Sequence, residues 1–149
     1  MNSTPIVLVE DNHDDEMLFR RALKQHRIMN HVVVLRDGAE ALDYLLGSGT
    51  PHSRDPIDAP PLILLDLKLP KVDGLEVLRR IRADERTSAL PVVILTSSSE
   101  ERDLVQAYGL KVNSYLVKPV DFSQFGDMVA HLGLYWLVLN QLPPCRRIA

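Results

Sequence analysis

The stretch Leu62–Gly74, which reads LILLDLKLPKVDG, decides the fold. Four large apolar residues lead to a single acid, Asp66, and turn-forming residues follow at Pro70 and at Asp73-Gly74. A short apolar run without alternation, bounded by turn residues, is typical of a strand buried on both faces of a parallel sheet. Asp66 is then expected at the carboxyl end of that strand, where open α/β sheets bind ligands. We therefore predict that Asp66 is a chemical nucleophile.

Four further apolar runs share this character, and amphipathic segments separate them. The predicted strands are Ile6–Val9, Val32–Leu35, Leu62–Leu65, Pro91–Leu95 and Ser114–Val117. Strands that alternate with helices form a parallel sheet covered on both faces, joined by right-handed crossovers. The predicted fold class is α/β, with a doubly wound five-stranded parallel sheet in the order 2-1-3-4-5 and helices on both faces.

The helices are predicted from apolar spacing and from acids suited to helix N-termini. They extend from Glu16 to about His26, from Asp37-Gly38 through Leu46, from Asp73 through Ile81, from Glu100 to Tyr108, and over about twenty residues from Asp121. In the first helix, Met17, Leu18, Ala22 and Leu23 are expected on one apolar side. Asp15 is expected to cap this helix; the alternative is that it orders the acidic loop.

Length and composition place the chain among ordinary globular proteins. It has 149 residues, 46% of them hydrophobic and 25% charged, which suits one domain with a full core at about residues 5–130. A net charge of −3 gives no electrostatic reason to expect nucleic acid or an anionic membrane as a partner. There is no transmembrane-length apolar stretch, no signal peptide and one cysteine, Cys145, so a cytoplasmic protein is expected.

Charged and polar residues follow four of the predicted strands. Glu10 and Asp11 follow the first strand, Asp66 the third, Thr96 the fourth and Lys118 the fifth. In the expected sheet these residues converge on one crevice, where clustered carboxylates repel one another unless a cation neutralises them. Hard carboxylate oxygens favour Mg²⁺, a lysine ammonium suits a phosphoryl oxygen, and a hydroxyl can donate to another. This set predicts binding and transfer of a phosphoryl group.

Four motifs resemble, in their order and spacing, those of the receiver domain of bacterial response regulators. They are VLVEDN, LLDLKLPKVDG, VVILTS and SYLVKP. The resemblance extends from Pro5 to about Ala130, and it implies the flavodoxin-like fold of that family. It also implies that Asp66 accepts a phosphoryl group from the phosphohistidine of a sensor histidine kinase or a phosphotransfer protein. The chain would then catalyse only its own phosphorylation and dephosphorylation, as a signalling protein.

The resemblance implies further roles for residues around Asp66. Asp11, Asp66 and the backbone carbonyl of Lys68 would bind Mg²⁺, with Mn²⁺ able to substitute, and Glu10 would act through bound water. Thr96 and Lys118 would contact the phosphoryl group, and Tyr115 would turn inward as the Thr96 hydroxyl moves toward phosphate. The Lys118–Pro119 peptide bond is expected to be cis. The Lys68 side chain either contacts phosphate or is simply solvated.

Three details resemble one subgroup, the single-domain regulators that partner phytochrome-type sensor kinases in cyanobacteria and other bacteria. They are Glu10-Asp11-Asn12, the proline-rich segment Gly47–Pro61 and the aromatic pair at Tyr135-Trp136. The subgroup implies a bacteriophytochrome kinase as partner. From its composition, Gly47–Pro61 is a surface loop, with a lid or partner-binding role as the alternative.

The segment Leu132–Leu139 leaves almost no polar face on the last helix. A contiguous apolar surface predicts a homodimer through this helix and the tail, about residues 121–149, and intramolecular cover is the alternative. The expected dimer contacts are Leu134, Tyr135, Trp136, Leu137, Val138 and Leu139. Because so few residues follow, the output is expected to be the chain's own altered surface.

Three other functions compete with the receiver interpretation. A flavodoxin-like cofactor binder would need a phosphate cradle in the first loop, where Glu10-Asp11 repels phosphate. An aspartyl-phosphate phosphatase would need a second acid where Lys68 stands. A degenerate receiver that only binds partners would not need the full set of acids, hydroxyl and lysine.

Overall fold

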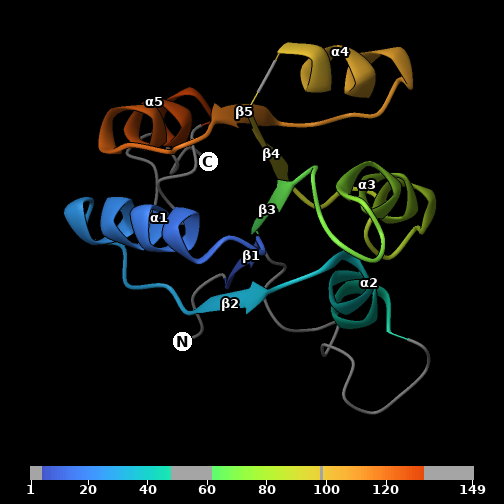
Figure 1. Ribbon diagram of the computed structural model, residues 1–149, viewed down its shortest axis with the longest axis horizontal. Coiled ribbons are helices and arrows are strands. Elements are labelled where there is room, and N and C mark those ends of the chain that lie inside the picture. The colour runs from blue at the N-terminus through green and yellow to red at the C-terminus, as the bar shows by residue number, and fades with distance from the viewer. Residues whose placement is uncertain (1–4, 48–61, 98, 133–149) are drawn as a thin grey trace, which may run out of the picture.

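A computed structural model describes residues 5–47, 62–97 and 99–132. Its core is a five-stranded parallel sheet in the order β2-β1-β3-β4-β5, which confirms the predicted topology (Figure 1). The strands are β1 (Ile6–Val9), β2 (Val32–Leu35), β3 (Leu62–Asp66), β4 (Val92–Thr96) and β5 (Ser114–Val117). β3 and β4 each extend one residue beyond the prediction, so Asp66 and Thr96 are the last residues of their strands.

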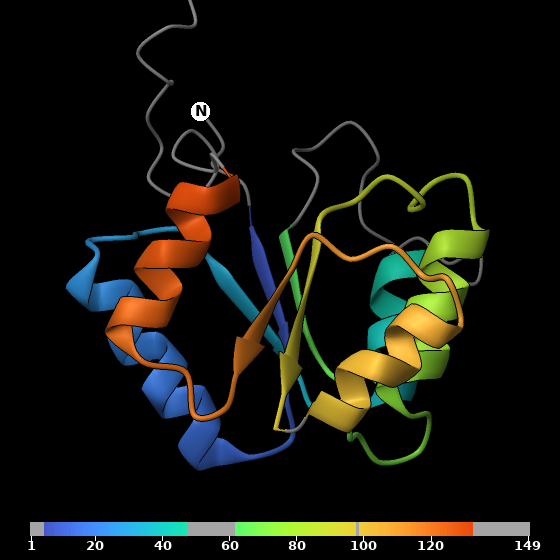
Figure 2. The ribbon, with the colours of Figure 1, turned by 90° about the horizontal axis from the view of Figure 1, so that it is seen from above.

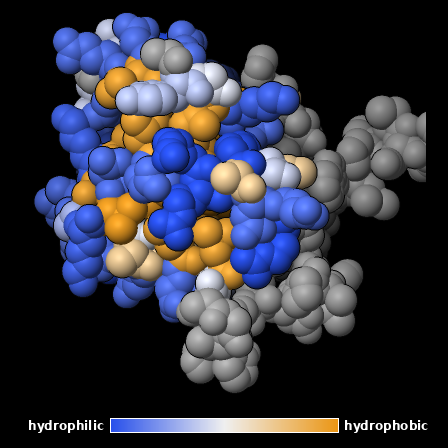
Figure 3. Space-filling view, turned by 90° about the vertical axis from the view of Figure 1, so that its right-hand side faces the viewer, coloured by the Kyte–Doolittle hydropathy of each residue, from blue (hydrophilic) through white to orange (hydrophobic). Residues whose placement is uncertain are grey.

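Helices cover both faces of this sheet, as predicted. They are α1 (His13–Gln25), α2 (Gly38–Leu46), α3 (Gly74–Ala83), α4 (Ser99–Ala107) and α5 (Phe122–Leu132). α1 and α5 lie together on one face, and α2, α3 and α4 lie on the other (Figure 2). On that second side, hydrophilic side chains alternate with apolar patches at the surface (Figure 3).

The three central strands are buried along their full length, which explains their apolar sequences. Alternate side chains of β1, β3 and β4 enter two separate cores, one on each face of the sheet. Phe19 of α1 and Phe125 of α5 meet edge to face in the first core, with ring centroids 5.5 Å apart. The second core is filled by aliphatic residues of α2, α3 and α4.

The first helix differs from the prediction at both its cap and its buried side. Asn12 is the N-cap, with its side chain accepting from the Asp15 amide at 2.9 Å, so the prediction that Asp15 caps the helix is wrong. Phe19 is buried, whereas Met17 is 49% exposed. The buried residues Glu16, Phe19, Ala22 and Leu23 recur at intervals of three and four and form one face, whereas Met17 lies off that face.

The loop between β3 and α3 is tied closely to the end of β3. Asp73 caps α3 as predicted, its side chain accepting from the Glu76 amide at 3.0 Å. The Gly74 amide donates to the Leu67 carbonyl at 2.8 Å. A Cβ on Gly74 would lie 2.2 Å from the Asp66 carbonyl oxygen, so only glycine fits without moving the backbone beside Asp66.

Part of the predicted twenty-residue last helix, beyond Leu132, lies outside the described residues, and so do two further predictions. One is the loop role of Gly47–Pro61, of which only Gly47 is described, and the other is the dimer contact over residues 134–139. Within the described ranges, every helix falls short of the length and apolar character that a membrane span requires.

Replacing Gly74 by alanine should lower the free energy of unfolding by about 1–3 kcal/mol, because the added methyl group overlaps backbone atoms. Gly109 is the matched control: its φ is +67° and a Cβ there would meet open space. Gly109→Asn should lower stability by less than Gly74→Ala, by about 0.5 kcal/mol, because the positive φ strains every side chain but asparagine less than most. Urea denaturation measures the free energy of unfolding of each variant. An equal decrease in the two variants would contradict the close approach at Gly74.

Candidate functional site

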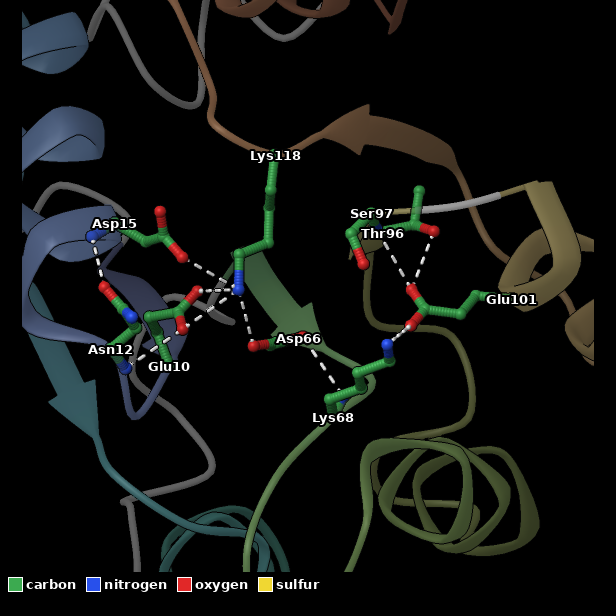
Figure 4. A network of polar contacts seen from close by, with 9 residues as sticks. All are labelled: Glu10, Asn12, Asp15, Asp66, Lys68, Thr96, Ser97, Glu101 and Lys118. Carbon is green, nitrogen blue, oxygen red and sulfur yellow. Dashed lines mark hydrogen bonds and ion pairs between the residues drawn. The ribbon is translucent and has the colours of Figure 1, made fainter.

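The predicted site residues meet at the carboxyl edge of the sheet (Figure 4). Glu10 directly follows β1, Asp66 ends β3, Thr96 ends β4 and Lys118 directly follows β5. Glu10, Asp66 and Thr96 are all buried, at 1%, 3% and 1% exposure. The register of the sheet therefore brings together groups that are distant in sequence, as predicted.

Lys118 lies at the centre of this cluster. Its Nζ is 2.8 Å from Asp66 Oδ2, 3.0 Å from Asp15 Oδ2 and 3.2 Å from Glu10 Oε1. Burial alone would lower the pKa of Lys118, but its hydrogen bonds to Asp66 and Asp15 and the surrounding negative charge hold that pKa above its ordinary value. The ammonium is therefore charged at neutral pH. The Lys118–Pro119 peptide bond is cis, as predicted.

Asp15 belongs to the site, although the sequence favoured a capping role for it. It lies in the first turn of α1, where its backbone amide is bonded to the Asn12 side chain. Its carboxylate is thereby free to reach Lys118. The alternative interpretation, in which Asp15 helps to order the acidic loop, agrees better with this geometry.

Three carboxylates form a group that can hold a cation. One oxygen each from Glu10, Asp11 and Asp66 lies within 4.8 Å of the others. Burial, and then the Asp66 charge, raise the pKa of Glu10 to about 7. Glu10 Oε1 is buried and, although it pairs with the Lys118 ammonium at 3.2 Å, it accepts no hydrogen bond from the described part of the chain. Because a single ammonium faces several carboxylates, negative charge is in excess here, which fits a hard divalent cation.

Asp66 is oriented by two donors on opposite sides. Its Oδ1 accepts from the Lys68 backbone amide at 3.0 Å, and its Oδ2 accepts from Lys118 at 2.8 Å. A hollow of about 510 Å³ lies next to this strand end. Its lining includes Asp11, Lys68, Asp73 and Glu101, together with apolar side chains such as Leu67 and Leu104.

Thr96 has a partner that the sequence did not predict. Its Oγ1 donates to Glu101 Oε1 at 2.8 Å, and the Ser97 amide donates to the same oxygen at 3.1 Å. The Lys68 side chain, which the sequence left as either phosphate-binding or solvated, pairs with Glu101 Oε2 at 3.4 Å. No sequence signal separates Glu101 from the other exposed-looking acids at the start of α4.

Tyr115 occupies a half-buried position on β5, next to α4. The guanidinium carbon of Arg102 lies 5.1 Å from the centre of its ring. Burial raises the pKa of the Tyr115 hydroxyl. The ring packs against the second core, to which β4 and α4 contribute Ile94 and Val105.

Comparisons with known proteins agree with this geometry. Residues 6–130 match a family model described as the response regulator receiver domain. The probable methanogenesis regulatory protein FilR2 of Methanothrix harundinacea is 46% identical over 139 residues, which cover 93% of this chain and 86% of that protein. Response regulator Rcp1 of Synechocystis sp. is 40% identical over 138 residues, which cover 93% of this chain and 92% of Rcp1.

Solved structures give the same result. The bacteriophytochrome response regulator RtBRR has a TM-score of 0.81 at 51% identity, covering 95% of this chain and 85% of that one. Rcp1 in its Mn²⁺-bound form has a TM-score of 0.71 at 39% identity, covering 94% and 99%. With its sheet order, its acidic group and its lysine in agreement, the chain belongs to the response regulator receiver family.

Proposed function

We propose that this response regulator accepts a phosphoryl group on Asp66 in a Mg²⁺-dependent reaction. The observation that carries the proposal is the setting of Asp66: a buried carboxylate at a strand end, bonded to Lys118 and grouped with Glu10 and Asp11. The donor is the phosphohistidine of a sensor histidine kinase or of a phosphotransfer protein.

In the transfer step, one Asp66 oxygen forms a bond to phosphorus while the bond from phosphorus to the donor's imidazole nitrogen breaks. The electron pair of the broken bond stays with the imidazole. Lys118 and the Lys68 amide hold the carboxylate in place, and the Lys118 ammonium neutralises charge on the phosphoryl oxygens. In a separate hydrolysis step, a water oxygen forms a bond to phosphorus while the bond from phosphorus to the Asp66 oxygen breaks. Inorganic phosphate leaves, the electron pair stays on the Asp66 carboxylate, and the chain thereby acts as an autophosphatase.

Asp11, Asp66 and the Lys68 backbone carbonyl would hold the metal ion, with Glu10 acting through water. When bound, the cation supplies positive charge to the phosphoryl oxygens and removes the repulsion among the carboxylates. That the relative Rcp1 has a Mn²⁺-bound form supports the proposal of a divalent cation for this chain. Mg²⁺ is the proposed cation, and Mn²⁺ can substitute because it also favours oxygen ligands.

We infer that the partner is a phytochrome-type kinase, on the strength of the 51% identity to the bacteriophytochrome response regulator RtBRR. The proposed setting is the cytoplasm, where such a kinase would present its phosphohistidine. Thr96 and Tyr115 are the proposed switch residues. We further propose a homodimer through Leu134–Leu139, because this segment of the sequence consists of apolar and aromatic residues.

Asp66→Asn should abolish phosphorylation, because an amide nitrogen or oxygen cannot form a stable acyl phosphate. With Mg²⁺ and acetyl phosphate, intact mass spectrometry should show one added phosphoryl group on the parent chain and none on the variant. Asp43→Asn, an exposed acid of α2, is the matched control and should be labelled like the parent. Labelling that survives Asp66→Asn, or a parent chain that never gains phosphate, would refute the assignment.

Mg²⁺ should raise the melting temperature, because it binds the folded acidic group. At ten times its dissociation constant the stabilisation is about 1.4 kcal/mol, or roughly 3–6 °C for a chain of this size. The shift should be smaller at pH 6 than at pH 8: with a pKa of about 7, Glu10 is mostly protonated at pH 6, so the site is less negative. Asp11→Asn should lose the shift and the exposed Asp14→Asn should keep it; equal shifts in both would count against this site.

The proposed dimer is tested by sedimentation velocity at micromolar concentration. The parent chain should sediment as a dimer, and Trp136→Ala with Leu137→Ala should sediment as a monomer of unchanged circular dichroism. A parent chain that is monomeric with and without phosphorylation would exclude the dimer while leaving the phosphoacceptor proposal intact.

A further inference from the structure

Glu101 of α4 reaches back to the end of β4 and binds the donors there (Figure 4). Its side chain is largely buried, and the residue as a whole is 8% exposed. Oε1 accepts two hydrogen bonds, from the Thr96 hydroxyl at 2.8 Å and from the Ser97 amide at 3.1 Å. Both donors lie at the end of β4, where Leu95 is paired with Asp66 of the neighbouring strand β3. A carboxylate outside the phosphoacceptor cluster therefore holds the polar groups at the adjacent strand end.

The other Glu101 oxygen connects this contact to the loop after β3. Oε2 lies 3.4 Å from Nζ of Lys68, which stands two residues after Asp66. The Lys68 side chain is 74% exposed, so this ion pair is weak. It nevertheless places Glu101 between the two loops that flank the space beside the Asp66 carboxylate.

We propose that Glu101 is a positioning residue that holds the Thr96 hydroxyl in the unphosphorylated state and competes with the phosphoryl group for it. The inference rests on the proposed function, phosphorylation of Asp66. A threonine hydroxyl has a single hydrogen to donate. When it bonds a phosphoryl oxygen, its bond to Glu101 must break, so the strength of that bond opposes the switch.

The energetic consequence follows from the charge of the acceptor. A hydrogen bond to an ionised carboxylate is roughly twice as strong as one to a neutral amide. A ligand shifts a two-state equilibrium only by the difference between its affinities for the two states. Weakening the resting-state contact leaves that difference unchanged but raises the population of the competent state, so the apparent affinity rises. The stronger the bond between Glu101 and Thr96, the more of the phosphoryl group's binding free energy is needed to break it and move Thr96.

A merely structural role for Glu101 must be distinguished from this one. Glu101 stands in the first turn of α4, where a carboxylate that accepts from backbone amides stabilises the helix start. Such a role would lower stability when Glu101 is replaced, but it would not depend on the Thr96 hydroxyl. The two roles are therefore distinguished by whether the effect of replacing Glu101 disappears when the Thr96 hydroxyl is removed.

The experiment measures the binding of beryllofluoride, a phosphoryl analogue, to the full chain in the presence of Mg²⁺. Glu101→Gln should lower the half-saturating concentration about fivefold, the difference between a charged and a neutral acceptor. Glu100→Gln, its exposed neighbour on α4, is the matched control for loss of one negative charge and should change it less than about twofold. Glu101→Ala serves as a second variant, and thermal unfolding checks that each variant is folded.

The same substitution is then made in a Thr96→Val background. There Glu101→Gln should change beryllofluoride binding by less than about twofold, because no hydroxyl remains to be released. An unchanged half-saturation in Glu101→Gln and Glu101→Ala, or the full fivefold effect in the Thr96→Val background, would overturn the proposal. Absence of beryllofluoride binding to the parent chain would instead refute the phosphoacceptor function itself.

Discussion

One ammonium group, that of Lys118, holds the functional edge of this protein together. It lies among carboxylates from the β1 end, the first turn of α1 and the β3 end. Without it, three acids that the fold brings within a few ångströms of one another would repel and take up protons. The positive charge enters from β5, on the far side of β4, so the site is complete only when four of the five strands have assembled.

Much of this arrangement could be predicted from the sequence, because it depends on patterns that a parallel sheet imposes. Strands buried on both faces have continuous apolar sequences, so Leu62–Asp66 alone indicates β3 and the acid at its end. Asp73 was recognised as a cap because its side chain bonds an amide three residues on, which is a local interaction. Features fixed by short-range chemistry or by strand order were therefore accessible.

The missed features share a physical cause, which is that each depends on side-chain direction in three dimensions. Both Asn12 and Asp15 are suitable caps, and only the helix start at His13 decides between them. The rotation of α1 about its own axis against the sheet places Phe19 inward and Met17 outward. Glu101 is one of two consecutive acids at the start of α4, and its contact with Thr96 depends on how the helix is set against β4.

The two cores on either side of the sheet have a consequence for how such a chain can evolve. β1 and β3 are buried on both faces and bonded along their length, whereas the reactive groups project beyond the strand ends. Aliphatic substitutions in the two cores can therefore accumulate through compensating changes of volume without reaching the charged edge. Selection on partner choice and on signal lifetime can act on the loops and on α4 while the scaffold drifts separately.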